Sequence, residues 1–135
     1  MILLIDLESD VPLYQQLRDR VVEAIAAGQL RAGDSLPSTR QLASDLGINF
    51  HTVNKGYDEL RAERLVRLNR KSGAVVQRDP TSGPPSEGFP ESWADRARTL
   101  LAEALAHGMP PDEVVDSCRR ILTTFRAENR GGEPS

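Results

Sequence analysis

The stretch that decides the fold is 38-STRQLASDLGINFHTVNKGYDEL-60, in which two short helical patterns lie on either side of a glycine. Ser38 and Gln41 are spaced as in a capping box, where the serine hydroxyl accepts from the backbone N–H of Gln41 and the glutamine side chain reaches back. Gly47 suits the tight corner that follows, and Asn49 suits the N-terminus of the next helix. The stretch therefore predicts a helix-turn-helix.

The second helix of this pair has an apolar face and a polar face. Val53, Tyr57 and Leu60 repeat at i, i+4 and i+7, so at 100° per residue they lie on one side. Polar side chains occupy the opposite side and its flank: His51, Thr52, Asn54 and Lys55. Their donors and acceptors are of the kind that contact base edges and phosphates in DNA. A solvated helix face has the same composition, so this helix alone does not decide the function.

The flanking segments complete a small domain. Residues 12–27 predict a first helix, with Pro12 in its first turn, Gly28 just past its end and four apolar residues at four-residue spacing: Leu13, Leu17, Val21 and Ile25. Residues 65–68 and 74–77 predict two strands joined by a basic turn. Three helices followed by such a hairpin form a winged helix-turn-helix. In that fold the second paired helix enters the major groove, and the hairpin lies near the backbone or minor groove.

The composition excludes several function classes. The longest apolar run covers residues 1–5, far short of the eighteen or more that a membrane span needs, and no export signal surrounds it, so we expect a cytoplasmic protein. One cysteine and two histidines are too few for a multi-thiolate zinc site, and we expect no metal and no cofactor. The chain also lacks a glycine-rich phosphate loop, a nucleophile elbow and a pair of catalytic carboxylates, so we do not expect an enzyme.

The net charge of −3 conceals an uneven distribution along the chain. Residues 36–78 carry eight lysines and arginines against four acids, whereas residues 80–135 carry six against nine. A basic region in an otherwise acidic protein favours a nucleic-acid-binding face, although scattered surface charge produces the same counts.

The C-terminal part of the chain follows a linker over residues 79–89, which is rich in proline and glycine. Two helices are predicted beyond it, one over 90–107 and one from Pro110 onward. Their apolar residues recur at helical spacing: Trp93, Ala97, Leu100, Leu101, Ala104 and Leu105 in the first, and Val114, Val115, Cys118, Ile121, Leu122 and Phe125 in the second. Cys118 is expected to be a small core residue rather than a redox sensor.

Two helices of this size cannot fold alone. Ordering them costs roughly 1.5 kcal/mol per residue, while burial returns only about 25 cal/mol per Å². The simplest partner is the same helix pair from a second chain, so the apolar residues above are candidate dimer contacts. A twofold dimer would present two recognition helices to a palindromic site about one DNA turn apart.

The run over residues 11–76 resembles the DNA-binding domain of GntR-type bacterial transcription regulators. The similarity rests on several short segments: PLYQQL at 12–17, GD at 33–34, LPSTR at 36–40, LA at 42–43, LGIN at 46–49, TV at 52–53, EL at 59–60, LV at 65–66 and SG at 72–73. The segment 49–57 is closer to the short YtrA-like subfamily, in which a helical C-terminal segment serves for dimerisation. The resemblance implies a bacterial, nucleoid-associated protein.

Three positions depart from the family pattern. Phe50 stands where many members have an arginine that contacts DNA, so it either packs on the core or touches a thymine methyl group. Arg64 stands where the family usually has glycine, so the turn into the hairpin can differ. Ala74 replaces a common Thr-Gly pair at the start of the second strand.

The resemblance also implies a set of DNA-binding residues. Arg40 and the region of Ser38 are expected at the phosphate backbone or groove edge, where the planar arginine fork binds two oxygens together. Asn54 can address an adenine edge, and Lys55 a phosphate. Gly73 would let the hairpin backbone approach DNA. The full set is Ser38, Arg40, Asn49, His51, Thr52, Asn54, Lys55, Arg70, Lys71, Ser72 and Gly73.

These observations predict a mainly helical protein with a small β-hairpin. Residues 1–78 form the winged helix-turn-helix, 79–89 the linker, 90–130 the two-helix dimerisation segment with a possible effector site, and 131–135 a flexible tail. The expected function is that of a homodimeric repressor that binds a palindromic operator in double-stranded DNA. An unknown small-molecule effector would release it. The alternative is a winged-helix module that binds DNA without sequence preference or binds a protein.

Overall fold

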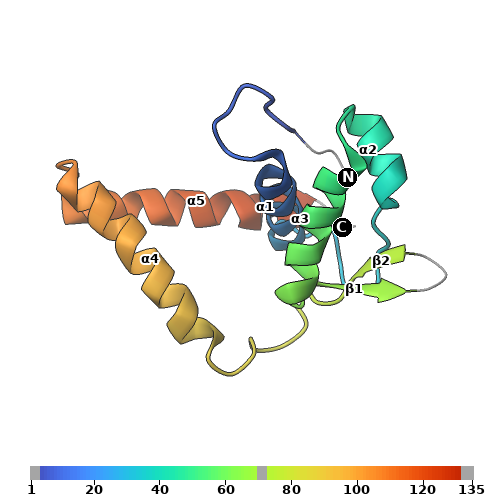
Figure 1. The fold of residues 1–135 in the computed structure, drawn as a ribbon. Coiled ribbons are helices and arrows are strands. Elements are labelled where there is room, and N and C mark those ends of the chain that lie inside the picture. The colour runs from blue at the N-terminus through green and yellow to red at the C-terminus, as the bar shows by residue number, and fades with distance from the viewer. Residues whose placement is uncertain (1–3, 70–72, 132–135) are drawn as a thin grey trace.

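The computed structural model describes residues 4–69 and 73–131. Figure 1 shows a small helical domain followed by two long helices, of which the first leads away from the domain and the second runs back toward it. The elements, in chain order, are α1 (Leu13–Ala26), α2 (Thr39–Leu46), α3 (Phe50–Ala62), β1 (Val66–Asn69), β2 (Gly73–Val76), α4 (Phe89–Ala106) and α5 (Pro111–Gly131). The expected mainly helical fold with one β-hairpin is confirmed. Within the described ranges, no helix is both long and apolar enough to span a membrane.

The core of the N-terminal domain lies where α1 crosses α3. Leu17 and Val21 of α1 are fully buried, as are Val53 and Leu60 of α3. Gly56 makes this crossing possible, because a Cβ atom at that position would lie 3.0 Å from both Leu17 Cδ2 and the backbone oxygen of the neighbouring Tyr14. A glycine in the middle of a helix is intrinsically unfavourable, so its value here is the close approach of the two helices.

The hairpin closes the domain on the side of α3. β1 and β2 are antiparallel, with Val66 opposite Val76 and Asn69 opposite Gly73. The strands are shifted by one residue from their expected bounds, to 66–69 and 73–76. The link before α2 continues the sheet, because the Leu36 N–H donates to the Ala74 oxygen over 2.8 Å. The β1–β2 hairpin, which is the wing of this fold, is thereby fixed to the segment that leads into α2.

Four helices end in the same hydrogen-bond pattern, in which a left-handed residue is followed by a residue whose N–H reaches back five positions. Glycine takes the left-handed position after α1, α2 and α4, at Gly28, Gly47 and Gly108. After α3 it is Arg64, with φ of 63°, and the Leu65 N–H donates to the Leu60 oxygen over 3.0 Å. The sequence departure at Arg64 is therefore a side chain in a backbone conformation that favours glycine.

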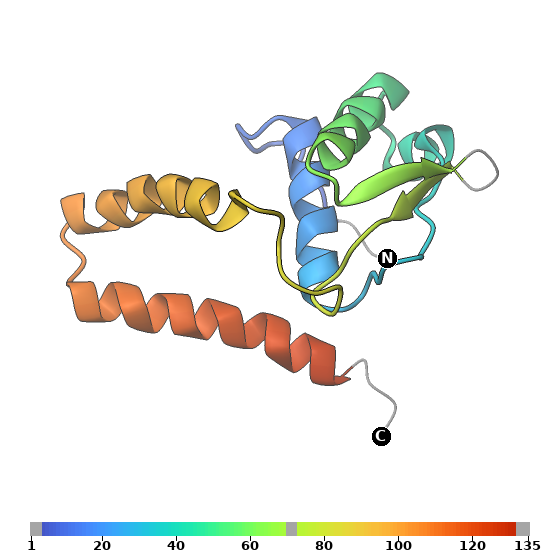
Figure 2. The same ribbon diagram turned by 90° about the horizontal axis from the view of Figure 1, so that it is seen from below.

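The last two helices form an open hairpin beside the domain. Figures 1 and 2 both show α4 and α5 joined at one end and directed away from α2 and the β-hairpin. Over residues 89–125 no side chain is buried. Cys118 is exposed, so the expectation that it is a core residue is wrong for a single chain. The reason is that α4 and α5 touch each other only loosely, so most of their large apolar side chains over residues 89–125 stay exposed in one copy.

Candidate nucleic-acid interface

The N-terminus of α2 carries the first part of the candidate interface. The Ser38 hydroxyl accepts from the Gln41 N–H over 3.1 Å, as expected for an N-cap. The reciprocal half of the capping box is wrong, because the Gln41 side chain donates instead to Asp45 Oδ1 over 2.8 Å. A carboxylate one turn further on is a charged acceptor, and it competes well for the amide. Ser38 is exposed, and so is Arg40 in the first turn of α2.

A buried tyrosine holds this helix start in place against α3. The Tyr57 hydroxyl donates to the backbone oxygen of Pro37 over 2.8 Å. Burial raises the pKa of the Tyr57 phenol, because the charged form would lose its hydration. The neutral hydroxyl therefore remains a donor, and it fixes the residue that precedes Ser38.

The N-terminus of α3 carries the second part. Asn49 is the N-cap, and its side-chain oxygen accepts from the His51 N–H over 2.8 Å. Its amide NH₂ group and the second lone pair of that oxygen are left for the expected DNA contact. His51 and Lys55 are exposed, whereas Thr52 and Asn54 are half-buried.

Two of the expected cations lie on aromatic rings. The Arg40 guanidinium carbon is 4.9 Å from the centre of the Phe50 ring, and the centre of the His51 ring is 4.1 Å from that of Phe50. The Lys55 ammonium nitrogen lies 4.0 Å from the centre of the Tyr14 ring on α1. The structure thus brings together Arg40 and His51 from different helices, and places Lys55 at the α1 edge of α3.

The wing is described only in part. Gly73 begins β2, is exposed, and has a φ of 76° that an L side chain rarely adopts. The expected basic contacts of Arg70 and Lys71, together with Ser72, lie outside the described residues.

Sequence reasoning missed several residues that shape this interface. Tyr14 gave no functional signal, because its contact with Lys55 depends on how α1 crosses α3. Gly56 gave none either, although a glycine inside a predicted helix is a hint of close packing. The family comparison did mark Phe50 as unusual, and the structure shows it half-buried against the core with Arg40 over its ring.

Comparisons with known proteins agree with this geometry. The family described as bacterial regulatory proteins, gntR family, matches residues 13–76. The transcriptional repressor YtrA of Bacillus subtilis is 33% identical over 101 residues, covering 75% of this chain and 71% of YtrA. The chain belongs to the GntR family.

Solved structures place it near the YtrA-like GntR regulators. YtrA of Sulfolobus acidocaldarius, a GntR-family transcription factor, matches with a TM-score of 0.61 and 40% identity over 78% of this chain and 99% of that one. A transcriptional antiterminator from Listeria monocytogenes shares the fold, with a TM-score of 0.83 and 21% identity over 93% and 92% of the two chains. The GntR relatives are named as transcription regulators rather than enzymes.

The share of each relative that this chain covers differs widely. The chain spans 64% of one curated GntR regulator and 15% of another. The part of this chain that the gntR family model matches, residues 13–76, contains all the expected DNA-binding residues of α2 and α3. The 101-residue alignment with YtrA is longer than this domain, so that similarity extends through the linker into α4.

Proposed function

We propose that this chain is a dimeric transcription repressor that binds a palindromic operator in bacterial DNA. The observation that carries the proposal is the exposed cluster at the N-termini of α2 and α3 in a GntR domain, where Arg40, His51 and Lys55 lie around the start of the helix expected to enter the major groove. Arginine and lysine would bind phosphates, while Thr52 and Asn54 would face base edges.

The apolar faces of α4 and α5 support dimerisation. Eight large apolar residues of these helices are exposed in one chain: Phe89, Trp93, Leu100, Leu101, Leu105, Val115, Ile121 and Leu122. So many large apolar side chains exposed on one helix pair mark an interaction surface. A second copy would cover it symmetrically and would hold two recognition helices about 34 Å apart, which is one turn of DNA.

Repression is the direction of regulation that the YtrA relationship favours, since the YtrA of B. subtilis is named a repressor. A dimer bound across a promoter can repress by occlusion alone, so the mechanism requires no contact with RNA polymerase. The proposal places the protein at the nucleoid, in the cytoplasm.

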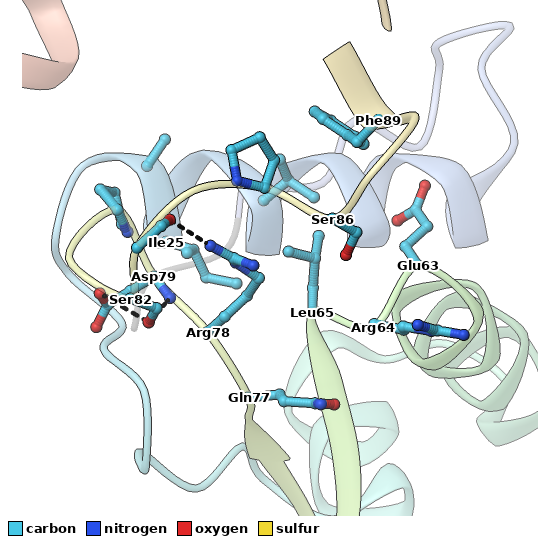
Figure 3. Close-up of a pocket in the computed structure, with 15 residues that line it drawn as sticks. Ile25, Glu63, Arg64, Leu65, Gln77, Arg78, Asp79, Ser82, Ser86 and Phe89 are labelled. Atoms are coloured by element: carbon cyan, nitrogen blue, oxygen red, sulfur yellow. Dashed lines mark hydrogen bonds between the residues drawn. The ribbon is translucent and has the colours of Figure 1, made fainter. Parts of the chain in front are cut away.

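Release by a small molecule would take place in the cleft beneath the linker. Figure 3 shows this cleft between α1, the turn after α3 and residues 78–89. Its volume is about 740 Å³, within the range of small-molecule sites, and its lining includes Ile25, Leu65 and Phe89. Arg78 donates through Nη2 to the backbone oxygen of Gly83 over 2.7 Å. A ligand that took over this contact would change where α4 leaves the domain, and with it the spacing of the two heads.

The cleft favours a small acid with an apolar body. Arg64 and Arg78 both line it, the carboxylate of Glu63 is paired with Arg18 at 2.8 Å, and that of Asp79 accepts from the Ala32 and Thr81 N–H groups. Benzoate and isovalerate are suitable probes. Either should raise the melting temperature and weaken operator binding, and Arg78→Ala should abolish the thermal shift. A panel of such acids without effect would remove the cleft from the proposal.

DNA binding is tested by fluorescence anisotropy with the promoter upstream of the protein's own gene and with a shuffled duplex, over a salt series. We expect a preference of roughly a thousandfold that weakens as salt rises. Arg40→Ala should remove most of the affinity, while Arg96→Ala, an equal charge change on α4, should not. Equal weak binding to both duplexes would favour the alternative module without sequence preference. Light scattering at low micromolar concentration should give a dimer, and a monomer would contradict the assembly.

A further inference from the structure

Two exposed cations of the candidate interface are held by aromatic rings. Arg40 lies 4.9 Å from the Phe50 ring centre, and Lys55 lies 4.0 Å from that of Tyr14. Both distances are within the range of a cation–π attraction. Within the described residues neither cation forms an ion pair with an acid.

An aromatic ring and a carboxylate can both hold a cationic side chain in place, but they differ in how much of its charge they leave available. An acidic partner would fix the side chain but would also cancel much of its charge toward a phosphate. The face of an aromatic ring fixes the side chain and leaves the full positive charge available. It also reduces the rotamer freedom that a long side chain would otherwise lose on binding DNA.

The position of Phe50 fits this role closely. It is the first residue of α3 and packs on the hydrophobic core, so its ring is anchored by the fold. The ring of His51 lies at 4.1 Å from it, tilted by 33°. Phe50 therefore connects a cation of α2 to the first turn of the recognition helix, α3.

We infer that Phe50 and Tyr14 are positioning residues for DNA binding. Phe50 orients Arg40 and Tyr14 orients Lys55, each before the DNA arrives. The inference rests on the proposed function, because the cations are useful in these positions only if this face meets a polyanion. On this inference Phe50 contributes to DNA binding by orienting Arg40, and not by touching a thymine methyl group.

The test is a double-mutant cycle on operator affinity. Phe50→Leu keeps an apolar side chain against the core but removes the π face, and should weaken binding about two- to fivefold. Phe50→Tyr keeps the face and should bind within about 1.5-fold of the wild type. In an Arg40→Ala background, Phe50→Leu should cause no further loss, because the residue it positions is gone. Thermal unfolding of each variant confirms that the domain is folded.

A readout without DNA tests the same geometry. The side-chain protons of Arg40 should show an upfield ring-current shift in the NMR spectrum of the free protein. Phe50→Leu should remove that shift and Phe50→Tyr should retain it. A missing shift in the wild type would overturn the inference, whatever the affinities are.

The affinities separate this inference from the proposed function. If the wild type prefers its promoter but Phe50→Leu weakens binding equally with and without Arg40, the function stands and the inference is overturned. In the other case, the wild type binds both duplexes equally, and Phe50→Leu weakens binding to both only when Arg40 is present. The positioning role then stands, and the proposal of sequence-specific binding is overturned. Tyr14→Leu and Tyr14→Phe, compared in a Lys55→Ala background, extend the test to the second pair.

Discussion

Arg64→Gly should stabilise this protein, although it removes a charged side chain from the surface. Arg64 ends α3 with φ of 63°, a conformation that costs a non-glycine residue roughly 1–2 kcal/mol. Glycine avoids that cost but loses roughly 0.5–1 kcal/mol more backbone entropy on folding. The difference predicts a net gain of about 0.5–1 kcal/mol in the free energy of unfolding.

The hydrogen bonds at this helix end should survive the substitution. They are made by the backbone, from the Arg64 N–H to the Arg61 oxygen over 2.9 Å and from the Leu65 N–H to the Leu60 oxygen over 3.0 Å. The Arg64 side chain is exposed and forms no ion pair within the described residues. The gain should therefore not be offset by a lost contact.

The assay is thermal and urea unfolding at one fixed protein concentration, since dimerisation would make the midpoint depend on concentration. For a domain of this size the gain corresponds to a rise of about 2–8 °C in melting temperature. Arg64→Ala is the matched control, because it removes the guanidinium but keeps a Cβ atom at the same φ. It should stay within about 0.5 kcal/mol of the wild type.

A mirror substitution tests the same reasoning in the opposite direction. Gly47 has φ of 69° and open space where a Cβ atom would lie, so Gly47→Ala meets no clash and adds only backbone strain. It should cost about 1 kcal/mol. The reasoning would be refuted if Arg64→Gly left stability unchanged, or if Arg64→Ala raised it by the same amount.

Three further predictions follow from packing, assembly and charge. Gly56→Ala should lower stability by about 1–3 kcal/mol in urea unfolding, because the new Cβ would lie 3.0 Å from Leu17. Leu100→Glu should convert the dimer to a monomer in light scattering, since Leu100 is 68% exposed in one chain, whereas Thr99→Glu, which lies off the apolar face of α4, should not. Hydrogen bonds from Thr81 and the Ala32 N–H lower the pKa of Asp79 to about 2, so its contribution to stability is present above its ordinary pKa of 3.8 and is lost as pH falls toward 2. Asp79→Asn should remove that part of the acid dependence of unfolding.

The helices of the DNA-binding domain could be predicted because local chemistry agrees with the final packing. Asn49 caps α3 with its own side chain, and Gly47 takes the left-handed turn that the sequence required. β1 begins one residue later than expected because the Leu65 N–H closes the turn after α3 by donating to the Leu60 oxygen, although the Leu65 oxygen still accepts from the Gln77 N–H across the hairpin. The Gln41 side chain was placed wrongly because a one-dimensional pattern does not show that Asp45 offers a stronger acceptor.

The parts that could not be predicted depend on how separate helices approach. Tyr14 and Lys55 meet only because Gly56 allows α1 and α3 to cross closely. The apolar residues of α4 and α5 were identified from their spacing, but the sequence does not say whether the same chain covers them. Among the described side chains of α4 and α5, most large apolar ones stay exposed, and so does Cys118. We therefore expect a partner surface to cover residues 89–125.

The linker over residues 79–89 joins the DNA-binding domain to the α4–α5 helix pair. The Asp79 carboxylate accepts from the Ala32 N–H over 2.8 Å, and Arg78 donates to Gly83, so the chain is tied to the domain before α4 begins. In a dimer formed through α4 and α5, the distance between the two α3 helices is then set by these contacts and by the cleft they border. A palindrome of fixed spacing selects one such distance, because both recognition helices must reach the major groove together. We therefore expect substitutions at the small polar contacts of residues 78–83 to change the affinity for a palindromic operator through the spacing of the two α3 helices.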